Sequence, residues 1–305
     1  KYKKQTPEEA EKVKAVGGLF ILGTERHESR RIDNQLRGRA GRQGDPGESK
    51  FYIALTDDIM RLFGSERVMS MMETLGLDED TPIDQKMLSN AIEQAQKKVE
   101  SRNFQIRKTV LEYDDVMNKQ RGIIYEQRRR VLDGEDVGSY IRSMISDVIE
   151  RNVRSVVGSG SFTDLEQFKS AISPFETVFL KRGEVKPASE EISAMTADDL
   201  IELLEEKAEA LYKMREKELD LIEGTEIPLM RELERVILLR VVDEYWMEHI
   251  DAMHELRRGI GLRSYGQTNP LDEYKREAFD MFEAMINGIK EEVVKRIFTV
   301  KVRKE

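Results

Sequence analysis

Residues 82–132 form the longest uninterrupted helical pattern in the chain, with no proline after Pro82 and a single glycine, Gly122. Thr81 and Pro82 suit the start of a helix, as cap and as first helical residue. A helix of about 50 residues extends about 75 Å, which is longer than most domains. The pattern therefore predicts a helical scaffold against which several packing units can lie. Its apolar residues recur mostly three or four positions apart, at 88, 92, 95, 99, 106, 110, 113, 117, 124 and 131.

The C-terminal two thirds of the chain is also predicted to be helical. We expect helices over 137–157, from Ala197 to about 222 behind the capping sequence Thr196-Ala-Asp-Asp199, over 228–258 and over 270–298. The last two are long and are joined by the loop 259–268, which predicts an antiparallel two-helix hairpin. The fold class is mainly α.

An α/β pattern occurs only near the N-terminus. Leu19–Leu22 is a short apolar run between glycines, a helical pattern follows over 28–36, and Phe51–Leu55 is a second apolar run. This strand–helix–strand order is the unit from which parallel sheets are built. Because two strands alone do not make a stable sheet, we expect a partial α/β end piece of a larger domain.

Composition limits the chemistry. The 305 residues include 50 Lys+Arg and 59 Asp+Glu, a net charge of −9, and no cysteine, which excludes disulfides, thiol nucleophiles and Cys-based zinc sites. His249 and His254 are five residues apart, which does not suit two ligands on one helix face, so no metal site is expected. With no long apolar run and no signal peptide, a cytoplasmic location is expected. Residues 1–50 carry 12 basic and 8 acidic residues, whereas the remainder carries a net charge of −13.

The densest functional pattern is Gln35-Leu-Arg-Gly-Arg39-Ala-Gly-Arg42-Gln-Gly-Asp45. Glycine lets a ligand approach the backbone, and guanidinium groups bind phosphate oxygens through paired hydrogen bonds. A plain basic helix end is one interpretation. The sharper one is an arginine finger, in which Arg39 and Arg42 stabilise charge on a γ-phosphate in the transition state. The spacing Gln-x-x-Gly-Arg-x-Gly-Arg is that of the last motif of superfamily 2 helicase-type motors.

Four segments extend the similarity beyond this motif: 23–46, which contains it, Tyr113-Asp-Asp-Val-Met-Asn-Lys-Gln-Arg121, Trp246-Met-Glu-His-Ile-Asp-Ala-Met253 and Leu262-Arg-Ser-Tyr-Gly-Gln-Thr-Asn-Pro270. Together they resemble the SecA family of bacterial protein-translocase motor ATPases over essentially the whole chain. The resemblance implies the end of a second RecA-like nucleotide-binding domain over 1–75, a long helical scaffold over 76–135, a helical wing over 136–225, and a two-helix finger with the end of the scaffold over 226–305.

The resemblance also implies roles for individual residues. Arg39 and Arg42 match the finger arginines, and Gln35, Arg42 and Asp45 match nucleotide-contacting positions. Leu262 and Tyr265 match the finger tip, which would touch the translocating polypeptide. An aromatic side chain suits such a sequence-tolerant contact because it offers a large apolar area at low entropic cost. From the sequence alone, the alternative for Tyr265 is packing against its own helices.

The function that the resemblance implies is the coupling of ATP hydrolysis to the movement of unfolded preproteins through the SecYEG channel. ATP with Mg²⁺ is the implied cofactor, and no zinc is expected in this segment. The implied partners are SecYEG, the preprotein and, through the full protein, an anionic membrane surface at the inner face of the plasma membrane. A homodimer is left open, and nucleic acid is not expected.

Two features separate this chain from a complete motor. It has no Gly-Lys dipeptide and hence no Walker A phosphate loop, and Val241-Val242-Asp243-Glu244 resembles a Walker B strand but lies in a helical pattern. We therefore expect a C-terminal segment that is inactive alone, although its parent is an ATPase. A fragment of a superfamily 2 RNA helicase shares the arginine motif but should have a basic body. A non-catalytic helical interaction module is the third alternative.

Overall fold

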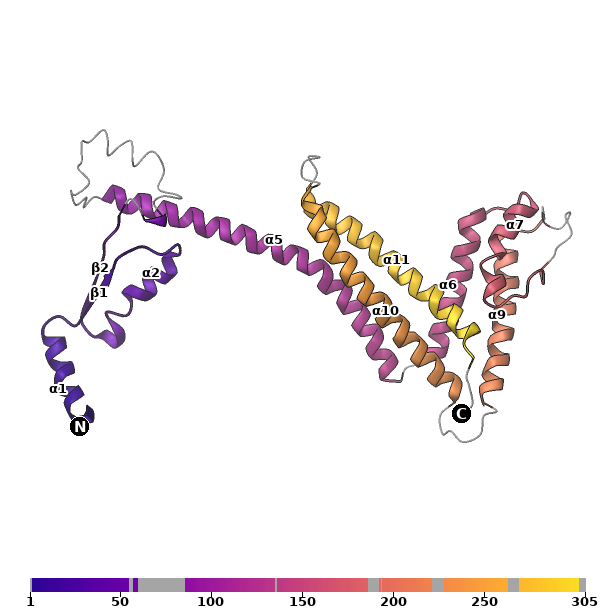
Figure 1. Cartoon of the computed structure of the whole chain (residues 1–305), viewed down its shortest axis with the longest axis horizontal. Helices are drawn as coiled ribbons and strands as arrows, with labels where there is room; N and C mark the ends of the chain where they lie inside the picture. The colour runs from indigo at the N-terminus through magenta and orange to yellow at the C-terminus, as the bar shows by residue number, and fades with distance from the viewer. Residues whose placement is uncertain are drawn as a thin grey trace. The chain divides into compact units, whose positions relative to one another are not determined.

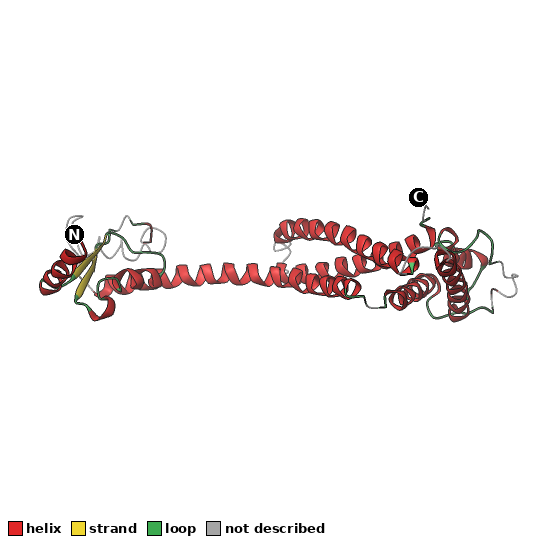
Figure 2. Cartoon of the chain, turned by 90° about the horizontal axis from the view of Figure 1, so that it is seen from below, coloured by secondary structure: helices red, strands yellow, loops and turns green. Residues whose placement is uncertain are grey.

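The long helical pattern forms a single helix, α5 (Lys86–Leu132), in the computed structural model, which describes residues 2–54, 57–59, 86–134, 136–185, 192, 194–220, 228–262 and 269–301 (Figure 1). The predicted mainly α fold class is confirmed, because helices dominate and the strands are confined to a small sheet (Figure 2). None of the described helices is long and apolar enough to cross a membrane. The remaining helices and strands are α1 (Tyr2–Ala15), β1 (Leu19–Gly23), α2 (Arg30–Arg37), β2 (Gly47–Phe51), α6 (Val137–Val157), α7 (Leu165–Ile172), α9 (Ala197–Asp220), α10 (Leu229–Gly259) and α11 (Pro270–Thr299).

The chain divides into two compact units, Lys1–Leu111 and Glu112–Glu305, and α5 contributes residues to both. The finer division into four parts at residues 75, 135 and 225 stays a prediction. Each unit has its own packing and is described separately below.

In the first unit, β1 and β2 pair in parallel, with Leu19 opposite Gly47 and Gly23 opposite Phe51. The strand–helix–strand order is as predicted, and α2 makes the connection between the strands. Two glycines, Gly18 and Gly47, allow backbone segments to approach each other closely where the two strands begin. A Cβ on Gly18 would lie 1.7 Å from the Pro46 carbonyl oxygen, and one on Gly47 would lie 2.0 Å from the Ala40 carbonyl oxygen.

The second strand was placed wrongly by its apolar pattern. It spans Gly47–Phe51 rather than 51–55, and most of its residues are exposed, so burial does not mark it in the sequence. The apolar residues after Phe51 serve another purpose, because Ile53 packs against Ile59, Ile92 and Ala95. Leu55 lies outside the described residues. The helix α1, which contains Pro7, was not foreseen.

A buried carboxylate joins the α2 region to α5. Asp33 is 1% exposed and accepts hydrogen bonds from Arg26 Nε at 2.6 Å, the His27 backbone N–H at 3.0 Å and Gln96 Nε2 at 2.6 Å. Gln96 also donates to the His27 carbonyl at 2.8 Å. Burial raises the pKa of Asp33, but hydrogen bonds from His27, Gln96 and Arg26 outweigh it and leave the pKa below its ordinary value. A second contact follows at Arg30, whose guanidinium lies 2.9 Å from Glu100 on α5.

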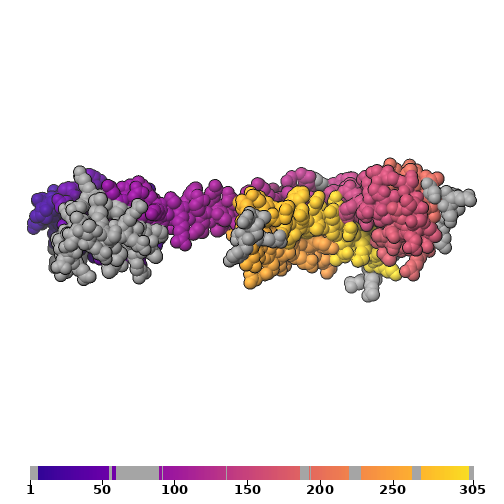
Figure 3. All heavy atoms as spheres, turned by 90° about the horizontal axis from the view of Figure 1, so that it is seen from above, coloured from indigo at the N-terminus to yellow at the C-terminus, as the bar shows by residue number. Residues whose placement is uncertain are grey.

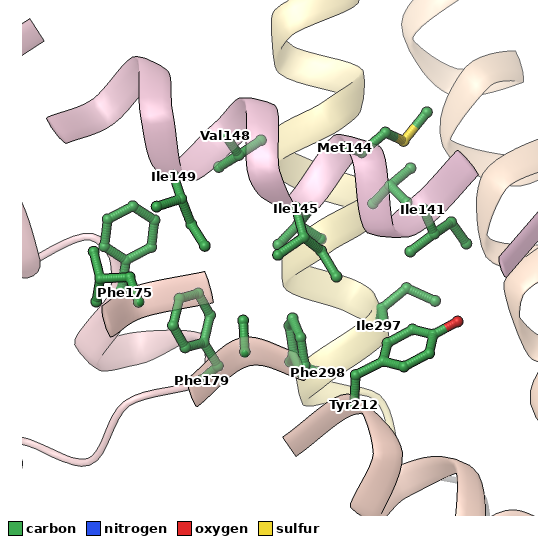
Figure 4. Close-up of a cluster of buried hydrophobic side chains, with 14 of the residues drawn as sticks. Ile141, Met144, Ile145, Val148, Ile149, Phe175, Phe179, Tyr212, Ile297 and Phe298 are labelled. Carbon is green, nitrogen blue, oxygen red and sulfur yellow. The ribbon is translucent and has the colours of Figure 1, made fainter. Parts of the chain in front are cut away.

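The second unit is organised around α6. Its residues Ile141, Ile145, Ile149 and Val153 are each 5% exposed or less, and they recur every fourth position. Figure 4 shows the isoleucines directed toward side chains from three other segments. These are Phe175 and Phe179 after α7, Tyr212 on α9, and Ile297 and Phe298 on α11, all members of the same buried cluster.

The predicted hairpin is formed by α10 and α11, which lie against each other (Figure 3). Gly288 on α11 makes the close approach possible, because a Cβ there would lie 2.6 Å from the Tyr245 ring. Asn269 caps α11 by accepting a hydrogen bond from the Leu271 N–H at 3.1 Å. Val241–Glu244 is helical, as its surroundings predicted.

Hydrogen exchange should separate the two units. We expect fast exchange over 19–23, because Leu19, Phe20 and Leu22 are each more than half exposed and the described sheet has two strands. Exchange along α6 should be slow because that helix is packed on several sides. Mass-spectrometric exchange of the chain measures both. Similar protection in the two segments would contradict this expectation.

Replacing Asp33 should loosen α2 from α5. Asp33→Ala leaves Arg26 without its buried partner, so the local opening free energy should fall by about 3 kcal/mol. Because the pKa of Asp33 is lowered by folding, its stabilisation is present above its unfolded pKa of about 4 and is lost as the pH falls through the folded value. Hydrogen exchange over 26–37 and 92–100 measures the change. Glu25→Ala, at an exposed position, is the control, and equal effects of the two variants would count against the assignment.

Candidate functional site

The arginine motif occupies the turn that leads from α2 back to β2. The helix ends at Arg37, and a short 3-10 turn, Arg42–Gly44, precedes the strand. Gln43 and Gly44 adopt left-handed backbone conformations, with φ of 57° and 83°. Because Gly47 begins β2 and packs against Ala40, the motif lies at the edge of the sheet where both parallel strands begin.

The motif side chains are presented to solvent. Gln35, Arg39, Arg42 and Asp45 are all exposed. Asp45 directly follows the turn, and its backbone N–H donates to the Arg42 carbonyl at 3.1 Å, which holds the two residues together. Gln35 lies further back, within α2. The structure thus brings Arg42 and Asp45 into direct contact through the backbone.

Four arginines of this region fall into two groups. Arg26 and Arg30 are bound to Asp33 and Glu100, so they hold the fold together. Among the residues that the structure describes, Arg39 and Arg42 have no carboxylate partner, and their guanidinium groups donate no hydrogen bond. Exposed guanidinium groups without a counter-charge are available to an anionic ligand. The sequence pattern pointed to both residues but could not show that their neighbours were already paired.

Lys14, outside the motif, and Arg37, within it, also make contacts at this site. Lys14 on α1 forms an ion pair with Asp45, with Nζ and Oδ1 3.1 Å apart, and this carboxylate raises the pKa of Lys14. Arg37 lies with its guanidinium carbon 5.2 Å from the centre of the Phe51 ring, a cation–π contact at the end of α2. Sequence reasoning missed Lys14 because it missed α1, and nothing in the local pattern relates Arg37 to Phe51.

The hairpin end is the second candidate site. A helical turn continues α10 to Leu262, whose side chain is 72% exposed. Ile260, two residues earlier, is buried with Met253, Tyr274 and Ala278. Leu262 is therefore directed away from the packed end of the hairpin. Tyr265 lies outside the described residues, so its predicted contact stays a prediction.

No group of three or more His, Asp or Glu side chains in the described part of the chain is arranged to hold a metal ion. His249 is buried and bonded to Gln120 on α5, and His254 is exposed. The two histidines therefore occupy different environments on α10.

Comparison with known proteins gives the family. Residues 82–301 match the model of the SecA wing and scaffold domain, and residues 1–80 match that of the SecA P-loop domain. The chain is 54% identical over 292 residues to the protein translocase subunit SecA of Syntrophomonas wolfei, a match that covers 96% of this chain and 34% of that protein. It is 54% identical over 302 residues to the subunit of the same name from Carboxydothermus hydrogenoformans, with 99% and 34% covered.

A third relative, the protein translocase subunit SecA of Acetivibrio thermocellus, is 53% identical over 301 residues, with 99% of this chain and 32% of the relative covered. The chain thus spans about a third of the length of the curated relatives it matches. The family model over 1–80 covers the arginine motif, and the one over 82–301 covers the scaffold helix and the hairpin. The chain belongs to the SecA family.

Proposed function

We propose that this chain is part of an ATP-driven motor that moves unfolded secretory proteins through the SecYEG channel. The observation that carries the proposal is a pair of exposed arginines, Arg39 and Arg42, which have no carboxylate partner in the described part of the chain. The relatives of this chain are named protein translocase subunits. Membership in this family does not support the RNA-helicase or the non-catalytic alternative.

In the proposed reaction, Arg39 and Arg42 donate hydrogen bonds to the transferring γ-phosphate of ATP. Charge that develops on its oxygens is stabilised by guanidinium groups already held in place, which is how an arginine finger accelerates hydrolysis. The left-handed turn at Gln43 and Gly44 supports Arg42, while the pairing of Asp33 with Gln96 anchors the start of α2. Gln35 and Asp45 contact the nucleotide beside them.

The rest of the nucleotide site is proposed to come from a part of the protein beyond this chain. Residues that cradle the phosphates and bind Mg²⁺ are needed, and this sequence has no Walker A loop. Asp45, the only carboxylate in the motif, is paired with Lys14, so we assign no Mg²⁺ ligand to this chain. Mg²⁺ bound elsewhere would neutralise phosphate charge.

The hairpin end is proposed to contact the moving polypeptide through Leu262 and Tyr265. Leu262 is 72% exposed, so its side chain is accessible for such a contact. The motor would act at the cytoplasmic face of the plasma membrane, with SecYEG, the preprotein and an anionic membrane surface as partners. Self-association into a homodimer belongs to the same proposal.

Arg42→Ala in the full-length protein should lower ATP turnover by about three orders of magnitude, the usual contribution of an arginine finger. Nucleotide affinity should change less, because the finger acts mainly on the transition state. Steady-state ATP hydrolysis and equilibrium nucleotide binding measure the two effects. Lys12→Ala, an exposed cation on α1, is the control. The 305-residue chain alone should not hydrolyse ATP, and turnover by it would refute the assignment of the phosphate site to another part.

Substitutions at the hairpin end should impair transport without impairing the motor. The double variant Leu262→Ala/Tyr265→Ala should retain its melting temperature and ATP turnover but move less preprotein into vesicles that contain SecYEG. Met247→Ala is a matched control, because Met247 is 68% exposed on the side of the same hairpin. Crosslinks from position 265 to the preprotein are expected during transport. A large fall in melting temperature would instead show that these side chains pack.

A further inference from the structure

A buried polar bridge connects three helices of the second unit. Gln120 on α5 is 6% exposed and donates from Nε2 to the Ala278 carbonyl on α11 at 2.9 Å. Its Oε1 lies 2.9 Å from His249 Nε2 on α10. Since Oε1 can only accept, His249 Nε2 carries the proton. Burial lowers the pKa of His249, which agrees with a neutral ring, and Trp246 and Phe282 flank that ring at 5.7 and 5.8 Å.

This bridge is the central one of three polar contacts that define how α5 and α10 run past each other. Asp114 pairs with Arg257 at 2.7 Å, and Arg128 lies 3.2 Å from Asp243. As the residue number rises along α5, that of its partner on α10 falls by nearly the same amount, so the helices are antiparallel in one constant register. The two outer pairs are substantially exposed on long side chains, and such pairs contribute little and tolerate displacement. The central contact is buried.

Apolar packing alone specifies this register poorly. Met253, Tyr274 and Ala278 form a small cluster with Met281 on α11 and with Met117 and its neighbours Tyr113 and Val116 on α5. Methionine is unbranched and fills irregular spaces, so it accepts more than one arrangement. A displacement of α10 along α5 by one helical turn would leave Gln120 and His249 buried without partners.

We propose that Gln120 fixes the register of the α10–α11 hairpin on α5 and is thereby a positioning residue for polypeptide movement. One side chain bonds to both helices of the hairpin, so neither can slide alone. Ala278 permits the contact because its small side chain lets α5 approach the α11 backbone, and it is fully buried. The link to transport rests on the proposed function, whereas the register can be measured independently of it.

The structural test uses the 305-residue chain. Because its sequence contains no cysteine, cysteines introduced by substitution can be spin-labelled specifically. Labels at Tyr125→Cys on α5 and Glu283→Cys on α11, both exposed, report the distance between the helices by pulsed electron paramagnetic resonance. Gln120→Met keeps the length of the side chain and removes its hydrogen bonds, so the distance distribution should broaden or become bimodal. Asn118→Met, at an exposed position on α5, should leave it unchanged.

A double variant separates register from stability. Gln120→Met/His249→Phe removes both members of the buried side-chain hydrogen bond together, so neither is left without the other, and its melting temperature should equal or exceed that of the wild type. The distance distribution should nevertheless stay broad. In the full-length motor, preprotein transported per ATP should fall between about twofold and thirtyfold in both Gln120 variants, the range for a single residue that carries coupling.

A narrow, wild-type distribution in the double variant would overturn the proposal, since packing alone would then set the register. Loss of folding in the double variant would also overturn it, because the bridge would be a structural requirement. A broad distribution with unchanged transport per ATP would refute the positioning role. If the unmodified full-length protein neither hydrolyses ATP nor transports, the proposed function fails while the distance measurement still decides the register.

Discussion

The second unit depends on the burial of α6. A helix in a bundle commonly buries one stripe, but the buried positions of α6 occupy neighbouring rows, with Met144 and Val148 beside Ile141, Ile145 and Ile149. Contacts with α7, α9, α10 and α11 cover this wide face. Burying a side chain of this size is worth about 1.5–3 kcal/mol, so these positions dominate the stability of the unit. The hairpin is held in place because α11 and α10 complete this core.

Buried polar groups play a different part in both units. Asp33 and Gln120 each join segments that are distant in the chain, and each makes hydrogen bonds that only one arrangement satisfies. A third case is Glu234, which is fully buried, accepts a hydrogen bond from the Tyr212 hydroxyl and pairs with Arg231 at 2.6 Å. Burial raises the pKa of Glu234 despite these partners. Such groups add less to stability than apolar burial does, but they reject alternative packings because a lost partner is costly.

Both candidate sites combine exposed side chains with flanking helices that buried residues hold in place. Arg39, Arg42 and Leu262 are exposed on short turns whose flanking helices are fixed by buried contacts. In the first unit, Arg26 pairs with Asp33 on α2 and Arg30 pairs with Glu100 on α5. These two carboxylates are therefore neutralised by arginines other than Arg39 and Arg42. The structure therefore exposes the side chains of the arginine motif and restrains the backbone that carries them, which are the conditions that the proposed arginine finger requires.

Local physical chemistry determined most of the helices from sequence alone. Thr196 and Asp199 form the reciprocal cap that their spacing predicted, and α11 begins with an Asn269 cap followed by Pro270. The arginine motif was also visible, because its glycines and arginines are contiguous. Tertiary structure alone decided the position of β2, whose exposed residues carry no apolar signal, and the role of Ile53, which packs on α5. It alone decided which arginines are paired, since Glu100 lies 70 residues from Arg30, and it joined Gln120 to Ala278 across 158 residues. Periodicity indicates which face of a helix can pack, although Ile106 and Val110 of the apolar series on α5 are exposed. A hydrogen bond between distant helices depends on their register, which no local pattern specifies.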